Sequence, residues 1–270
     1  MIDGLSLTLA DGTILAVHVD GPEGAPCVVF ANSVLTDLSV WDAQARALAG
    51  RYRVVRYDQR GHGASEAFEG KMDFDRYGAD LLAVMDAAGV EKCAVVGLSM
   101  GCPTALAAVA AAPHRFVAFV AVDGVMRSAP GRDVYWTERR EIALNDGMQA
   151  IADTTVSRWL AGEPADTDIS IRLEKMILGT SSAGFAAATY ALSSYDHSTA
   201  LTCPILGIAG AEDGPMPDAV AEHFGQFPGA QIVIIPDAGH LPNFQNPEAF
   251  NAVLLAFLED KAFPTPKETV

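Results

Sequence analysis

The sequence predicts an α/β fold built around a mostly parallel central sheet, and three observations lead to this class. Near-continuous apolar runs recur along the 270 residues, as expected for strands that are buried on both faces of a parallel sheet. Segments of helical periodicity lie between these runs, which indicates βαβ units with helices on both faces of the sheet. One long helical stretch interrupts the alternation and predicts an insertion.

The first element expected is an antiparallel hairpin at the edge of the sheet. Alternating segments at 5–9 and 14–19 flank the dipeptide Asp11-Gly12, which favours a tight hairpin turn. Buried strands are then expected at 27–31, 53–57, 93–96, 116–122, 204–209 and 231–235. Helices are expected between and after them at 41–49, 74–88, 104–111, 219–227 and 247–258.

The interruption separates the strands at 116–122 and 204–209 by about 80 residues of helical character. It is too long for a crossover and too helical for a loop. We therefore expect a helical cap at 126–200 over the C-terminal edge of the sheet. The core domain then consists of 1–125 and 201–262, and a frayed tail is expected at 263–270.

Composition limits the classes of function. The formal net charge of −16 argues against nucleic acid as a partner, although a few arginines in a cleft can still attract a small anion. No segment approaches the roughly 18 apolar residues of a membrane span, and residues 1–10 lack the pattern of a signal peptide. We expect a cytoplasmic protein with a small-molecule substrate, and nothing in the sequence specifies an oligomeric state.

The four cysteines lie in or beside apolar segments, without a C-x-x-C pair or the spacing of metal ligands: Cys27, Cys93, Cys102 and Cys203. They are expected to be reduced residues of the core. No metal site and no cofactor is predicted.

The pentapeptide G-L-S-M-G at 97–101 lies between the apolar run at 93–96 and the helix at 104–111. A strand that passes through G-x-S-x-G into a helix describes a nucleophile elbow, which holds the serine hydroxyl at the C-terminal edge of the sheet. Both glycines are needed because a Cβ there would collide with backbone passing close to the turn. We predict Ser99 as the nucleophile, with an ordinary strand-to-helix turn as the alternative.

A serine hydroxyl needs a base, usually a histidine that is oriented by a carboxylate. His240 is the candidate, because its loop follows the strand at 231–235 and so reaches the same edge of the sheet as Ser99. His197, at the end of the cap, could also approach a substrate, and His62 is expected to organise a tight loop. The other histidines are expected to be ordinary surface or core residues: His18, His114 and His223.

The same reasoning selects Asp213 as the carboxylate, because it lies just beyond the strand at 204–209. Glu212 is adjacent but should point the opposite way. Asp123 directly follows the strand at 116–122 and remains a rival. The negative oxygen formed during acyl transfer needs two backbone N–H donors.

Met100, just after the nucleophile, should supply one of these donors. Val34, in the loop after the first central strand, should supply the other, with Ser33 as support. Ser33 is also expected to contact the substrate.

On these residues the chain resembles the α/β-hydrolases, in which serine, acid and histidine follow one another in this order. Within that superfamily it resembles the 3-oxoadipate enol-lactonases over most of its length. The pair Asn32-Ser33, the elbow, and the segments 56–65 and 152–159 carry this resemblance. The segment 239–250 is shared more widely among α/β-hydrolases.

The resemblance implies the α/β-hydrolase fold without a cofactor, Ser99 as nucleophile, Asp213 as acid and His240 as base. It also implies an enol-lactone substrate that bears a carboxylate, and a role in aromatic catabolism. Two positions depart from the family: Val34-Leu35 replaces the usual Leu-Gly, and Cys102 replaces a second glycine after the elbow. We therefore expect Leu35 and Cys102 to contact the substrate and to alter its identity.

A substrate carboxylate would need a cation, and Arg158 or another arginine of the cap is the candidate. Trp159 is expected to line the site beside it. Further aromatic candidates are Tyr135, Trp136 and Tyr190.

The predicted function is that of a cofactor-independent serine hydrolase that cleaves a small lactone or carboxylic ester through an acyl-enzyme. The alternative is amide or carbon–carbon bond hydrolysis of a small carboxylated metabolite by the same triad. A third hypothesis, of a different class, is a non-catalytic small-molecule receptor on the same fold.

Overall fold

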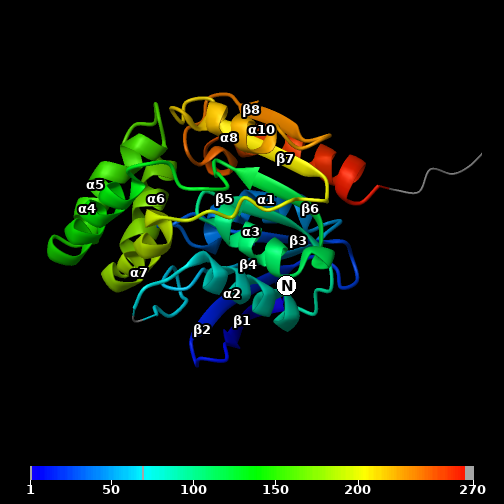
Figure 1. Ribbon diagram of the computed structural model, residues 1–270, viewed down its shortest axis with the longest axis horizontal. Helices are drawn as coiled ribbons and strands as arrows, with labels where there is room; N and C mark the ends of the chain where they lie inside the picture. The colour runs from blue at the N-terminus through cyan, green and yellow to red at the C-terminus, as the bar shows by residue number, and fades with distance from the viewer. Residues whose placement is uncertain (1, 69, 265–270) are drawn as a thin grey trace, which may run out of the picture.

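The computed structural model describes residues 2–68 and 70–264, which form an eight-stranded sheet with helices on both sides (Figure 1). Its strand order is β1-β2-β4-β3-β5-β6-β7-β8. The strands are β1 (Ile2–Thr8), β2 (Ile14–Asp20), β3 (Cys27–Ala31), β4 (Arg53–Tyr57), β5 (Cys93–Leu98), β6 (Phe116–Val122), β7 (Ile205–Gly210) and β8 (Gln231–Ile235).

The helices of the first half are α1 (Asp42–Leu48), α2 (Phe74–Ala87) and α3 (Gly101–Ala111), with short 3₁₀ helices η1 (Leu38–Trp41) and η2 (Pro113–Arg115). The second half contains α4 (Arg132–Asn145), α5 (Met148–Trp159), α6 (Asp168–Gly179), α7 (Ser182–Ser193), α8 (Met216–Phe224), α9 (Pro242–Gln245), α10 (Pro247–Phe257) and a π-helical turn, η3 (Leu258–Ala262). Among the described residues, no helix is long and apolar enough to cross a membrane.

The sheet is antiparallel at its N-terminal edge and parallel elsewhere. β2 pairs antiparallel with both β1 and β4, whereas the six strands β4, β3, β5, β6, β7 and β8 all run parallel to one another. The predicted hairpin and the predicted parallel sheet are therefore confirmed. β5, which leads into Ser99, lies between β3 and β6 in the middle of the sheet.

Each face of the sheet carries its own hydrophobic core. In β3, Val28 and Phe30 belong to the core shared with α1 and α10, whereas Val29 and Ala31 belong to the core shared with α2, α3 and α8. Successive side chains of a strand point to opposite faces, so a strand with helices on both sides must be apolar at every position. This explains the continuous apolar runs that predicted the strands.

Helices α4 to α7 occupy the long interval between β6 and β7, and we call them the cap. Figure 1 shows them gathered at one end of the sheet, where α4 packs along α7. The long interval between these two strands is thus helical, as predicted. The division of the chain into a core domain and a cap domain stays a prediction. From residue 265 onward, the predicted tail lies outside the described residues.

Three expectations about elements need correction. The β8 segment was expected to be buried on both faces, but it is the edge strand and Ile234 is 42% exposed. The helix after the elbow begins at Gly101 rather than 104, because the turn leads into it directly. Helix α8 begins at Met216 instead of 219, and α9 was not predicted.

Candidate active site

Ser99 stands on a strained turn between β5 and α3. Its backbone φ is 50°, in the left-handed region that residues with a side chain seldom adopt. A Cβ on Gly97 would overlap the carbonyl of Gly101, and one on Gly101 would overlap the carbonyl of Ala31. The N–H of Ser99 donates to the carbonyl of Val122 at 2.8 Å, which ties the turn to the end of β6. The glycines at both flanks are therefore required by close approach of the backbone.

Loops from three strand ends bring Ser99, His240 and Asp213 together. The Oγ atom of Ser99 lies 3.0 Å from Nε2 of His240, and Nδ1 of His240 lies 2.7 Å from Oδ2 of Asp213. When Nδ1 carries the proton and donates to Asp213, Nε2 is free to accept the proton of the serine hydroxyl. Glu212 is exposed and takes no part in this arrangement.

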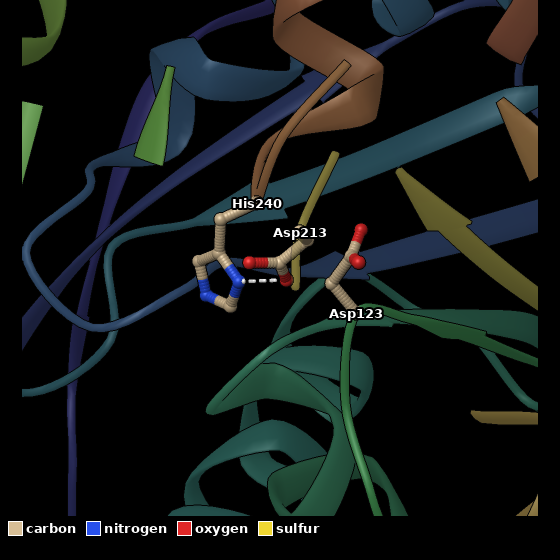
Figure 2. Close-up of side chains that lie close together, drawn as sticks. All are labelled: Asp123, Asp213 and His240. Carbon is tan, nitrogen blue, oxygen red and sulfur yellow. Dashed lines mark hydrogen bonds and ion pairs between the residues drawn. The ribbon is translucent and has the colours of Figure 1, made fainter. Parts of the chain in front are cut away.

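Asp123 lies beside Asp213 on the side away from His240 (Figure 2). One ligand atom from each of the three residues lies within 4.8 Å of the other two, so Asp123, Asp213 and His240 could in principle surround a metal ion. A metal ion on Nδ1 of His240 would break the hydrogen bond to Asp213. Burial and the neighbouring Asp213 carboxylate raise the pKa of Asp123 well above its ordinary value.

Two backbone N–H groups near Ser99 are available to a ligand. Met100 and Val34 both line the cavity in front of the serine, and within the described chain neither N–H has a hydrogen-bond acceptor. A buried N–H without an acceptor is uncommon in folded proteins. These are the two donors that the sequence predicted for an oxyanion hole.

A chain of buried polar side chains links the segments that carry these two donors. The Gln59 amide donates to the carbonyl of Asn32, two residues before Val34. Its Oε1 atom accepts a hydrogen bond from the Thr104 hydroxyl at 2.9 Å, and this hydroxyl also lies 3.1 Å from the carbonyl oxygen of Met100. Gln59 and Thr104 therefore fix the loop that carries Val34 relative to the elbow.

The loop that carries His240 is attached to the C-terminal end of α5. Oε1 of Gln245 accepts from the N–H of Gly239 at 2.8 Å, while Nε2 of the same side chain donates to the carbonyl of Ala161 at 3.0 Å. The ring of Trp159 lies 4.8 Å from the ring of His240, centre to centre. The cap thus contributes directly to the surroundings of the histidine.

A cavity of about 660 Å³ opens in front of Ser99, between the cap and the loops at the strand ends. The predicted site residues that line it are Ser99, Asp213, His240, Met100, Val34, Arg158 and Trp159. Tyr135 and Trp136 also line it, as expected, whereas Tyr190 does not. This wall of aromatic and aliphatic groups with a few polar atoms is typical of a site for a small molecule.

Two arginines of the cap face this cavity without a carboxylate partner among the described residues. The guanidinium groups of Arg132 and Arg158 lie 4.5 and 5.6 Å from the ring centre of Tyr135, and the first lies 5.0 Å from that of Trp136. Burial lowers the pKa of Arg132 somewhat, but an arginine stays charged at neutral pH. Arg132 was missed at the level of sequence, because nothing distinguishes it there from other cap arginines.

Three predicted substrate contacts are placed differently. Ser33, Leu35 and Cys102 are completely buried and do not line the cavity. Cys102, in the first turn of α3, packs against Gly124, and its Sγ atom lies 4.0 Å from the carbonyl oxygen of Val125. Leu35 adopts φ of 66°, and its side chain joins the hydrophobic core. These side chains can act on the site only through the residues that they pack against.

The remaining histidines lie apart from Ser99. His197 packs against Phe74 and Tyr195 beside a separate small hollow. His62 is buried within its tight loop, where Nδ1 lies 3.1 Å from the carbonyl oxygen of Arg60, and burial lowers its pKa to about 4. His223, expected to be an ordinary residue, also lines the cavity.

Comparisons with known proteins agree with this geometry. The model of the "Alpha/beta hydrolase family" matches residues 28–253. The chain belongs to this family. This result confirms both the fold class and the resemblance predicted from the sequence.

Individual relatives match almost the whole chain. The 3-oxoadipate enol-lactonase 1 of Acinetobacter baylyi is 30% identical over 263 residues, which cover 96% of this chain and 98% of that protein. The structure of an enol-lactonase from Burkholderia xenovorans is 29% identical with a TM-score of 0.86, covering 94% of this chain and 99% of that one. A malate-bound thermophilic esterase from Thermogutta terrifontis is 26% identical with a TM-score of 0.88, covering 96% and 98%.

Proposed function

We propose that this α/β-hydrolase is a serine hydrolase that cleaves a small lactone or carboxylic ester through an acyl-enzyme. The observation that carries the proposal is the continuous line of hydrogen-bonding contacts from Ser99 through His240 to Asp213, at 3.0 and 2.7 Å. A serine hydroxyl in contact with a neutral imidazole that a carboxylate orients is the arrangement needed for nucleophilic attack at neutral pH.

The reaction follows from these contacts. His240 takes the proton of Ser99 through Nε2 as Oγ attacks the acyl carbon, and the negative oxygen is held by the N–H groups of Met100 and Val34. His240 then gives the proton to the departing oxygen, which leaves an acyl-enzyme. A water molecule activated by the same imidazole hydrolyses the ester of Ser99 and restores the free hydroxyl. No step requires a cofactor.

The substrate class that we infer is an ester or lactone with a nearby carboxylate. Arg132 and Arg158 supply charge at the cavity wall, and a guanidinium pairs well with a carboxylate. The enol-lactonase relatives, and the esterase structure that holds malate, a small dicarboxylic acid, support this inference. Aromatic and aliphatic side chains around the arginines would strengthen the attraction by excluding water.

The experiment combines labelling with a substrate panel. A fluorophosphonate should modify Ser99, as located by mass spectrometry of the digested protein. The variant Ser99→Ala should lower kcat by about 10⁴-fold or more on any ester or lactone that the native protein hydrolyses. Full turnover by Ser99→Ala would refute the mechanism.

The panel separates the predicted activity from its alternatives. It should contain anionic lactones, neutral and anionic esters, an amide and a dioxo acid. Faster turnover of the amide or the dioxo acid than of every ester and lactone would replace the proposed reaction with the alternative one. Tight binding of a panel compound without hydrolysis of any activated ester would indicate a receptor.

A further inference from the structure

Asp123 is a buried carboxyl group to which the proposed reaction gives no task. It follows β6 directly, is 1% exposed, and has a backbone φ of 41°. Such a conformation is unusual for a residue with a side chain, and it persists only where the surroundings enforce it. Here the backbone N–H of Asp123 donates to the carbonyl of Ile208 at 2.9 Å, which fixes the residue against β7.

The contacts of the carboxyl group are few. Its two oxygens lie 3.1 and 3.3 Å from a single donor, the backbone nitrogen of Gly210. Its other polar neighbour is the carboxyl group of Asp213, one oxygen of which lies within 4.8 Å of an oxygen of Asp123. Within the described chain, no lysine, arginine or histidine forms an ion pair with Asp123.

Two carboxylates so close to one another cannot both carry a charge without a large cost, particularly where one is buried. Asp213 is the better place for the charge, because its side chain is 17% exposed and is paired with His240. Burial and the neighbouring charge of Asp213 raise the pKa of Asp123, so the shared proton belongs on Asp123. A protonated carboxyl group has one O–H donor, and the acceptor facing it is Asp213.

We propose that Asp123 is a positioning residue whose protonated carboxyl group donates a hydrogen bond to Asp213 and holds that carboxylate against His240. Asp213 is then held from two sides, by the O–H of Asp123 and by the Nδ1–H of His240, in the order seen in Figure 2. The pair carries one negative charge. This inference rests on the proposed function, because Asp123 acts on Ser99 only through Asp213 and His240.

A protonated Asp123 leads to different expected effects on activity for two substitutions, Asp123→Asn and Asp123→Ala. In Asp123→Asn, the amide nitrogen can donate to Asp213 while the amide oxygen accepts from the N–H of Gly210, so the neutral acid is reproduced in shape and in hydrogen bonding. Asp123→Ala removes both the donor and the acceptor. If Asp123 instead worked as an anion, both variants would lose the necessary charge.

The first test is the pH profile of kcat and KM for an activated ester, with thermal unfolding of each variant as a control for folding. Asp123→Asn should retain kcat within about threefold, whereas Asp123→Ala should lower it by about tenfold or more at nearly unchanged KM. The acid limb should move to higher pH in Asp123→Ala alone. Asp213 without its second donor is a stronger acceptor, and it favours protonation of His240 more.

Two kinetic outcomes would overturn the inference. One is an Asp123→Asn variant as impaired as Asp123→Ala across the pH range. The other is an Asp123→Ala variant with native kcat and an unmoved acid limb.

The second test detects the proton on Asp123 directly and does not depend on turnover of a substrate. The infrared spectrum of the native protein at about pH 8 should contain the carbonyl stretch of a protonated carboxyl group that is missing from Asp123→Asn. Asp58, whose pKa burial raises to about 6, is ionised at that pH and does not interfere. Identical spectra of the two proteins would overturn the inference even if Ser99 proves to be the nucleophile. A band that disappears in Asp123→Asn would support it even if Ser99→Ala retains full activity.

Discussion

The backbone N–H of His240 donates to the backbone carbonyl of Trp159 at 2.8 Å, so the loop that carries the histidine is bonded to the end of cap helix α5. The indole of Trp159 lies 4.8 Å from the imidazole, which gives the same two residues a second contact. The position of His240 therefore depends on the cap as well as on β8. Changes at the end of α5 should reach the chemistry at Ser99.

Gly239 is the position where this dependence can be tested with one methyl group. A Cβ there would lie 2.5 Å from the carbonyl oxygen of Trp159 and 3.0 Å from the backbone nitrogen of Ala161. Gly239→Ala should therefore push the loop away from α5 and lower kcat/KM by about tenfold or more, because catalytic groups tolerate little displacement. Steady-state kinetics and the rate of phosphonate labelling at Ser99 would measure the effect.

Gly179→Ala is the matched control in the cap. It adds the same methyl group at the end of α6, where nothing lies within 4 Å of the new Cβ. It should leave kcat/KM unchanged and stabilise the helix by less than about 1 kcal/mol. Equal activity of Gly239→Ala and Gly179→Ala would show that the contact between cap and loop does not position His240.

Thr104 offers a test of the link between the two proposed oxyanion donors. Thr104→Val keeps the shape of the side chain but leaves Oε1 of Gln59 without its donor in a fully buried place. We expect a loss of about 1–3 kcal/mol in the free energy of unfolding and a several-fold lower kcat. Urea unfolding and ester kinetics would measure both. Thr104→Ser retains the hydroxyl and should restore kcat; a serine variant as slow as valine would count against the link.

The fold and the convergence of Ser99, Asp213 and His240 followed from the sequence because each obeys a local rule. Strands covered on both sides are almost continuously apolar, which identified β3 through β7. The carboxyl ends of parallel strands meet at one edge of the sheet. The loops carrying Ser99, Asp213 and His240 therefore had to converge, and the structure brings these residues within hydrogen-bonding distance.

The residues that line the cavity around Ser99 did not all follow, because packing between elements far apart in the sequence decides which side chains face it. Arg132 faces the cavity only because of how α4 lies in the cap, which no local pattern specifies. Leu35 was expected in the site, but its left-handed backbone directs the side chain into the core. The exposure of β8 was missed for a similar reason. The apolar content of a strand does not show whether another strand lies beside it in the sheet.

Arg132 and Arg158 should distinguish anionic from neutral substrates. Arg132→Gln and Arg158→Gln should each raise KM for an ester with a carboxylate by about tenfold, and should change KM for a neutral ester of similar size less than about twofold. Arg46→Gln, at an exposed position of α1 far from the cavity lining, makes the same change in net charge and should change neither KM. An equal increase in KM for both esters would mean that the arginines shape the cavity rather than bind a charge.

His62 should make the fold sensitive to acid. Burial depresses its pKa from the ordinary 6.5 to about 4, so the unfolded chain binds a proton in this pH range that the folded chain does not. The stability that His62 contributes is thus complete above about pH 6.5 and is lost as the pH falls toward 4, by about 3 kcal/mol in the limit. Asp58 acts in the opposite direction, because its pKa is raised to about 6 and the folded state takes up a proton as the pH falls through that value.

The effect of His62 is therefore best measured as a difference between proteins. Urea unfolding of the native protein and of His62→Asn across this pH range should give a free energy of unfolding that declines more steeply toward acid in the native protein, by up to about 3 kcal/mol. His114→Asn, which changes an exposed histidine, should follow the native curve. Parallel curves for the native protein and His62→Asn would mean that His62 takes up its proton equally well in the folded chain, and that the tight loop opens to water without unfolding.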